Sequence, residues 1–278
     1  MDHMRERLSP RVWSEGGRIL AGNVQGSGLV RVSASEVPAL RRKPGPIPEG
    51  WTRTPASLLR YSDEQTVAGT AAVFAAMETM GRVPEEFAGW GVVAASRYLG
   101  RTSLAAALRS FLAEGVWGTS PHLIPHFALH SPSGTISLAL GLHGPNLGVG
   151  GGLHAAAEGF LAALTWLAAG VVPGVWLVLS GWSPELVPDP AGRTVATGEC
   201  RALALALVAV DEEGARRRPA VRIVVDPGAQ PAMAPAPIDL IGLAESLATP
   251  GGPWPRMIAT DVGGRLRVEL LERSEGSG

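Results

Sequence analysis

The sequence predicts a mixed α/β fold, in which helices alternate with strands that are buried on both faces. Amphipathic helical patterns alternate with short apolar runs that have β-branched centres. Hydrophobic residues make up 46% of the 278 positions, which is enough for a sizeable core. Gly (36) and Pro (23) stand between the apolar segments without a fixed period, which excludes collagen-like and wholly disordered chains. Such an alternation implies a sheet covered by helices on both sides.

The first legible elements lie between residues 62 and 114. Residues 62–65 (SDEQ) have capping-box spacing, the following segment carries apolar residues at helical spacing, and Gly81 is a stop signal. These features predict an amphipathic helix. The apolar run at 90–95 predicts a strand, and residues 102–114 predict a second helix.

The later elements follow the same alternation. They are expected over 135–141 (strand-like), 160–169 (a central helix that is apolar nearly all round), 174–180 and 202–210 (strands buried on both faces), 221–225 (strand), 239–248 (helix) and 265–270 (strand). We expect one main domain over 1–213, of which 1–60 is poorly patterned. Residues 214–278 are expected to form an appended subregion on the same core.

Charge and cysteine content exclude several classes of protein. The 24 Lys+Arg balance 25 Asp+Glu, so nucleic-acid binding would need a local basic patch, and the best one, Arg216–Arg218, is too short. The lone Cys200 excludes a disulfide framework and fits a cytoplasmic location. Gly159–Pro184 is 26 residues without a charge, but its internal Gly and Pro divide it, so no membrane span is expected.

Two sequence patterns resemble cofactor or metal sites. His122, His126 and His130 recur every four residues, but the prolines between them disrupt a helix, so no metal site is expected. Gly148–Gly152 precedes a helix as phosphate-binding loops do, but it has no Walker lysine, and Leu153 stands where GxGxxG needs glycine. Close backbone approach at a tight turn is the preferred interpretation, and no cofactor is expected.

No serine or cysteine has a convincing nucleophile context. There is no Gly-x-Ser-x-Gly motif, and Ser180 is expected at a strand end. Cys200 enters an apolar strand, where a cysteine is usually a packing residue.

Residues 124–182 resemble the N-terminal half of a β-ketoacyl synthase of the thiolase superfamily. The likeness rests on the order of 133–137 (SGTIS), 141–145 (GLHGP), a short strand, a central helix closing on Gly170, and a following strand. Weaker likeness extends over about 60–225. The resemblance implies half of a thiolase-type fold, a mixed sheet with helices on both faces, with a small appended C-terminal α/β element.

The resemblance also implies where catalysis would reside. Counting nine residues on from Gly144 and 17 back from Gly170 places the nucleophilic cysteine of the family at Leu153. Leucine cannot attack a thioester. The family also uses two histidines from a C-terminal half, which we do not expect in this chain. The sequence therefore predicts no catalytic residue and a protein that is not an enzyme.

A half-length chain of this kind resembles the short chain-length-factor subunits of aryl polyene and type II polyketide synthases. The resemblance implies a heterodimer with a full-length β-ketoacyl synthase and, through that complex, contact with an acyl carrier protein in polyketide or fatty-acid-type biosynthesis. The interface candidates are Asn146, Leu147, Gly148, Val149, Gly150, Gly151, Gly152, Leu153 and His154. By a looser alignment, Leu104, Leu108 and Phe111 are candidates for the wall of an acyl tunnel, with core packing as the alternative.

Two other functions stay open. One is an independent enzyme that binds acyl-CoA or a nucleotide at the glycine-rich loop and uses His154 or Glu158. The other is a scaffolding pseudoenzyme without influence on product length, which the sequence does not separate from a chain-length factor because tunnels and cores both require apolar residues.

Overall fold

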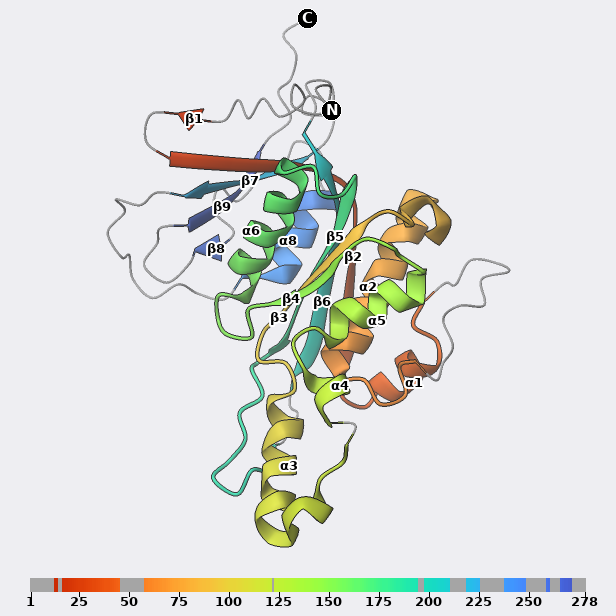
Figure 1. Ribbon diagram of the computed structural model, residues 1–278, viewed down its shortest axis with the longest axis vertical. Coiled ribbons are helices and arrows are strands. Elements are labelled where there is room, and N and C mark those ends of the chain that lie inside the picture. The colour runs from red at the N-terminus through yellow and green to blue at the C-terminus, as the bar shows by residue number, and fades with distance from the viewer. Residues whose placement is uncertain are drawn as a thin grey trace, which may run out of the picture.

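The computed structural model describes residues 13–14, 17–45, 58–121, 123–194, 198–210, 219–225, 238–248, 259–260 and 266–271. Its centre is one mixed sheet (Figure 1). The strands are β1 (Trp13–Ser14), β2 (Gly17–Ser33), β3 (Gly91–Ser96), β4 (Asn146–Val149), β5 (Gly174–Ser183), β6 (Glu199–Ala209), β7 (Ala220–Val225), β8 (Ala259–Thr260) and β9 (Leu266–Leu271). Their order is β4-β3-β5-β6-β2-β7-β9-β8, with β1 paired to β2. β3 is parallel to β4 and β5, and the other pairs are antiparallel.

Helices cover both faces of this sheet, which confirms the predicted fold class. The helices are α1 (Val37–Arg42), α2 (Glu64–Met80), α3 (Arg101–Glu114), α4 (Leu123–Phe127), α5 (Ser131–Leu140), α6 (Ala155–Ala168) and α8 (Leu240–Ala248). α2 and α5 lie on one face, and α6 and α8 on the other (Figure 1). Each face has its own apolar core, and alternate residues of β5 and β6 point into the two cores.

Several predicted elements are confirmed with small shifts at their ends. Asp63 caps α2 by accepting a 2.8 Å hydrogen bond from the Gln65 N–H, and Gly81 ends the helix in the left-handed conformation. The strand predicted at 90–95 is β3, and the helix predicted at 102–114 is α3. The central helix and the strands after it are α6, β5, β6 and β7, and the last helix and strand are α8 and β9.

The strand expected over 135–141 was wrong, because residues 135–140 belong to α5 and Gly141 is its C-cap. Pro132 occupies the first turn, where its missing N–H costs nothing, and Gly141 ends the helix in the left-handed conformation. Ile136 and Leu140 lie one turn apart and are both buried. A short apolar run does not by its period alone separate a strand from a helix.

The described part of the first 60 residues contains regular elements that the sequence pattern did not predict. Among them are the 17-residue strand β2, which lies between β6 and β7 in the sheet, and the helix α1. β7 and β9 extend the same sheet, so the division of the chain at residue 213 stays a prediction.

The uncharged segment Gly159–Pro184 is divided between α6 and β5, as its internal Gly and Pro suggested. Within the described ranges, no helix combines the length and the apolar character needed to cross a bilayer. Arg216–Arg218 and His122 lie outside the described residues.

Candidate functional site

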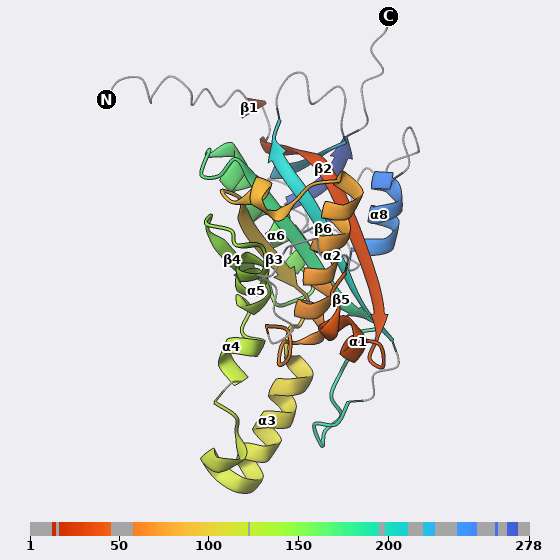
Figure 2. The same cartoon turned by 90° about the vertical axis from the view of Figure 1, so that its right-hand side faces the viewer.

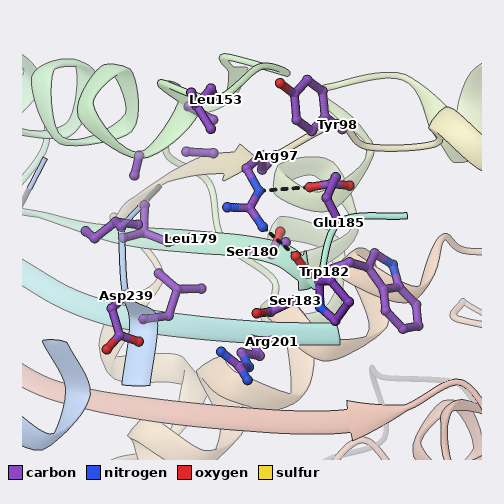
Figure 3. Close-up of a pocket in the computed structure, with 17 residues that line it drawn as sticks. Arg97, Tyr98, Leu153, Leu179, Ser180, Trp182, Ser183, Glu185, Arg201 and Asp239 are labelled. Carbon is purple, nitrogen blue, oxygen red and sulfur yellow. Dashed lines mark hydrogen bonds and ion pairs between the residues drawn. The ribbon is translucent and has the colours of Figure 1, made fainter. Parts of the chain in front are cut away.

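A cavity of about 550 Å³ opens where the parallel strands β3 and β5 end and α6 begins (Figure 3). Ligands of open α/β sheets commonly bind outside the carboxyl ends of parallel strands. Its walls are Ala95, Arg97, Tyr98, Leu153, Ala155, Ala156, Leu179, Ser180, Gly181, Trp182, Ser183, Pro184, Glu185, Arg201, Ile238, Asp239 and Leu240. The lining is apolar toward α6 and carries two arginines and two carboxylates elsewhere. Such a mixed cavity suits an amphipathic ligand.

Leu153 lies two residues before the first residue of α6 and lines this cavity. It is half-buried, and its neighbour His154 precedes the first residue of the helix. The position that the resemblance gave to a nucleophile therefore does face a cavity, but the side chain there is a hydrocarbon. No covalent step can begin at this side chain.

The glycine-rich loop before α6 is explained by close packing. A Cβ at Gly148 would overlap the Leu129 carbonyl oxygen, and one at Gly150 would lie 2.6 Å from Ala155. Gly150 and Gly151 have φ values of +80° and +99°, which side chains rarely adopt. The loop needs glycine for its own conformation, which favours the close-approach interpretation over a phosphate cradle.

A tight turn after β3 forms one wall of the cavity. The Arg97 N–H donates to the Ser180 carbonyl at 2.8 Å, and the Tyr98 N–H donates to the Gly151 carbonyl at 3.0 Å. Tyr98 has a φ of +52°, which is uncommon outside glycine. The Gln65 side-chain amide donates to the Arg97 carbonyl at 2.9 Å and thereby ties the turn to α2.

Behind this turn lies a buried carboxyl group, Asp63. Burial, followed by the neighbouring Glu64 carboxylate, raises the pKa of Asp63 to about 7, although hydrogen bonds from the Gln65 and Gly100 N–H groups act in the opposite direction. Gly100 directly precedes α3. Asp63 thus links the start of α2 to the start of α3.

Two arginines and their carboxylates form the polar part of the cavity. Arg97 pairs with Glu185 at 2.9 Å and also donates to the Trp182 carbonyl. Burial raises the pKa of Glu185, and Arg97 opposes that rise. Arg201 lies on β6, two strands away from β3 on the same face of the sheet, and contacts Glu199 at 3.4 Å.

The sequence did not identify this polar group. Arg97, Glu185, Arg201 and Asp239 come from separate elements, and the only local signal is that Arg97 directly follows a strand.

The interface candidates lie together along one edge of the molecule. Asn146–Val149 form β4, which ends the sheet and pairs with β3 alone among the described strands. Leu147 is 36% exposed. Gly150–Gly152 and Leu153–His154 connect this strand to α6, so the set is contiguous but divided between an edge strand and the cavity rim.

The three tunnel candidates lie elsewhere, on α3, which projects from one end of the molecule (Figure 2). Leu104, Leu108 and Phe111 are 41%, 59% and 44% exposed, and α3 has no buried residue. The alternative of core packing is therefore wrong for this chain. None of the three lines the cavity around Leu153, so their tunnel role stays a prediction.

His126, His130 and Cys200 are the remaining candidates that the structure describes. α4 ends at Phe127, so the spacing of the histidines has no continuous helix beneath it. No group of three metal-ligating side chains occurs among the described residues. Cys200 is fully buried, and burial raises the pKa of its thiol, in agreement with a packing role.

Comparison with known proteins identifies the fold. No family sequence model and no curated protein matches the chain. Among solved structures, a chain from the ketosynthase ApeO in complex with its chain length factor ApeC from Xenorhabdus doucetiae matches with a TM-score of 0.55 at 15% identity. The match covers 90% of this chain and 99% of that chain.

Two further matches have lower scores. The complex AntDE:AntF, a type II polyketide synthase acyl-carrier protein with its ketosynthase, gives a TM-score of 0.49 at 16% identity and 68% coverage of this chain. A β-ketoacyl synthase from Burkholderia phymatum STM815 gives 0.48 at 16% identity and 73% coverage. This chain spans 63% of the length of each of those two chains. Together with the sheet order and the two helical layers, the ApeO–ApeC match shows that the chain has a ketosynthase-like fold of the thiolase type.

Proposed function

We propose that the chain is a non-catalytic, chain-length-factor-like subunit that pairs in the cytoplasm with a full-length β-ketoacyl synthase and helps to shape its acyl pocket. The observation that carries the proposal is Leu153, an aliphatic residue at the start of α6 and on the cavity wall, in the position that the resemblance gives to the nucleophile. A subunit of this kind contributes surface and shape rather than chemistry. It would meet an acyl carrier protein only through the complex.

The extent of the structural match supports the same role. A chain of the ApeO–ApeC complex is matched over 99% of its length, whereas the ketosynthase from B. phymatum is matched over 63%. Likeness to a whole chain of a ketosynthase and chain-length-factor complex favours a partner subunit over an independent acyl-CoA- or nucleotide-binding enzyme.

The edge strand β4 is the surface that we propose for pairing with the synthase. An exposed edge carries backbone N–H and C=O groups that can pair with another chain. Leu147 adds apolar surface beside these groups. The projecting α3 arm, which comprises residues 101–118, supplies further exposed apolar surface. Its side chains Leu108, Leu112 and Trp117 are 59%, 76% and 93% exposed.

Co-expression with a full-length β-ketoacyl synthase, followed by size-exclusion chromatography with mass determination, tests the pairing. We expect a one-to-one complex. A chain that stays monomeric and does not bind the synthase would contradict the proposal. Condensation of acyl and malonyl carrier-protein thioesters by the purified chain alone would also contradict it.

A charge on the edge strand should prevent this pairing. Leu147→Lys places an ammonium group beside the unpaired edge, where burial against a partner would strip it of water. We expect the complex to be lost while the thermal unfolding of the chain changes little, because Leu147 is exposed. Val210→Lys is the matched control, since Val210 is 40% exposed and follows β6, three strands away from β4. Equal pairing by both variants would rule out β4 as the interface.

Shortening a side chain on the α3 arm should change the product. If Leu108 contributes to the acyl pocket, Leu108→Ala enlarges that pocket, and the complex should release longer products or assemble more weakly. Val83→Ala removes an exposed aliphatic side chain from the turn that follows α2 and is the control. Mass spectrometry of products and size-exclusion of the complexes give the two readouts. Unchanged products and assembly with Leu108→Ala would remove this residue from the pocket.

A further inference from the structure

Three arginines lie in one row across the sheet, and two of them, Arg97 and Arg201, line the cavity. The register places Arg31 of β2 opposite Arg201 of β6, and Arg201 opposite Gly181 of β5. Arg97 continues the row, because it follows Ser96, the partner of Ser180. The residues two positions away from this row on the same strands belong to, or pack against, the core beneath α6 and α8. They are Leu29, Ala95, Leu179 and Leu203. Alternation therefore directs the row to the α6 face, where the cavity lies.

Gly181 separates two of these arginines and leaves room between them. A Cβ at Gly181 would come within 3.3 Å of both Cβ and Nε of Arg97. The Arg97 side chain therefore lies over this glycine and reaches Glu185 at 2.9 Å. Any larger residue here would narrow the space between Arg97 and Arg201.

The row holds three guanidinium groups and two paired carboxylates. Glu185 pairs with Arg97, and Glu199 accepts three hydrogen bonds of 3.0–3.1 Å from Arg31. Arg201 reaches only the Glu199 Oε2 atom, at 3.4 Å, and that atom already accepts from Arg31. Like charges opposite one another on a sheet are unfavourable. Among the described residues, Arg201, with a side chain only 25% exposed, is therefore the least compensated cation of the row.

Asp239 is the other carboxylate on the cavity wall, and it lies at the start of α8. Its Oδ1 atom accepts a 3.1 Å hydrogen bond from the Ile241 N–H at the start of α8. Its Oδ2 atom lies 2.7 Å from the place where a Cβ of Gly242 would stand, so the carboxylate lies over the first turn of α8. Among the described residues it forms no ion pair with Arg201. An anion in the cavity would meet Arg201 directly.

We propose that this cavity binds an organic anion, with a carboxylate or phosphate head on Arg201 and an apolar body against Leu179 and Leu153. Figure 3 shows Arg201 and Asp239 at one end of the cavity, Leu153 at the other and Leu179 between them. A guanidinium fork matches both head groups, and burial strengthens the pairing. The inference goes beyond the partner role proposed above, because it gives the isolated chain a ligand of its own.

Calorimetric titration of the full chain with hexanoate, hexyl phosphate and hexanamide tests the site. The amide has the same apolar body without the charge. We expect one-to-one binding of at least one of the two anions at millimolar concentration or below, and binding of hexanamide weaker by about tenfold or more. The tighter of the two anions identifies the head group.

Four variants with different charges sharpen this test. Arg201→Gln should weaken anion binding by about tenfold or more, and Arg201→Lys, which keeps the charge but loses the fork, should lie between that variant and the natural chain. Asp239→Asn should strengthen binding, because it removes a nearby negative charge and still caps α8. Arg193→Gln is the control, since Arg193 is 74% exposed and pairs with Asp189 outside this cavity.

Three results would overturn the proposal. The first is that the natural chain binds neither anion, and the second is that it binds hexanoate and hexanamide with equal affinity. The third is that Arg201→Lys and Arg201→Gln both keep the natural circular dichroism spectrum and also the natural affinity for the anion. No synthase is present in these titrations, so their failure leaves the pairing experiment as an independent test of the proposed function.

Discussion

An Asp63→Asn variant is expected to be more stable than the natural chain at pH 8 and equally stable near pH 4. The folded protein holds Asp63 as a buried carboxyl group with a pKa raised to about 7 from 3.8. Because the folded state binds this proton more tightly than the unfolded state does, the stability that it contributes is present below pH 3.8 and is lost as the pH rises to about 7. Asparagine resembles the neutral acid in shape, caps a helix as well as aspartate does, and does not titrate.

The size of the effect follows from the same shift. About three pKa units correspond to roughly 4 kcal/mol in the free energy of unfolding above pH 7. For a chain of this length, that is about 10 °C in the midpoint of thermal unfolding. Calorimetric scans of both proteins between pH 4 and pH 8 give the difference directly. It should grow between pH 4 and pH 7 and be constant above.

Glu78→Gln is the matched control, further along the same helix. Glu78 is exposed and lies in the last turn of α2, so its replacement should change stability by no more than about 0.5 kcal/mol at either pH. A stabilisation by Asp63→Asn that is the same at pH 4 and pH 8 would mean that Asp63 is not the titrating group. A destabilisation at pH 8 would mean that the charged form is the one that the turn before α3 requires.

The sequence predicted the elements in which helix signals and apolar runs agree, and it missed β2 because of three glycines in the interior of this strand. Glycine weakens a strand pattern, and the interior of β2 contains Gly22, Gly26 and Gly28. Each lies beneath a helix. A Cβ at Gly22 would lie 2.7 Å from Leu164 of α6, and one at Gly28 would lie 2.5 Å from the Ala76 nitrogen of α2. Close helix packing on a central strand selects these glycines, and one-dimensional patterns do not contain that packing.

The residues of the candidate site could also be predicted only in part from the sequence. Leu153 could be located by the resemblance to a β-ketoacyl synthase, because the motifs that carry the resemblance lie on both sides of it along the chain. Arg97 and Arg201 are brought together only by the order of β3, β5 and β6, and neither belongs to a local motif. The α3 arm was predicted as a helix, but its exposure depends on tertiary structure: apolar residues at helical spacing suggest a buried face, and here that face projects from the body.

Removal of the indole of Trp176 is expected to be the most destabilising single change among those discussed here. Trp176 is fully buried on β5, with ring centroids 5.0 Å from Phe87 and 5.9 Å from Trp90. Trp176→Ala leaves a cavity in this aromatic cluster, which should lower the free energy of unfolding by about 3–5 kcal/mol. Urea denaturation followed by circular dichroism measures the loss without relying on the fluorescence of the replaced residue.

Trp176→Phe should lower the free energy of unfolding far less than the lost side-chain volume suggests. The buried Nε1–H of Trp176 has no hydrogen-bond partner among the described residues, and an unpaired buried donor costs about 1–3 kcal/mol. Phenylalanine removes that donor and keeps most of the ring contacts, so we expect a net change within about 1.5 kcal/mol. Trp117→Ala, at a site 93% exposed on the α3 arm, should leave stability within about 0.5 kcal/mol and instead weaken pairing with the synthase. If Trp176→Phe proves as destabilising as Trp176→Ala, the indole N–H has a partner in solution, and the cluster depends on that hydrogen bond as well as on packing.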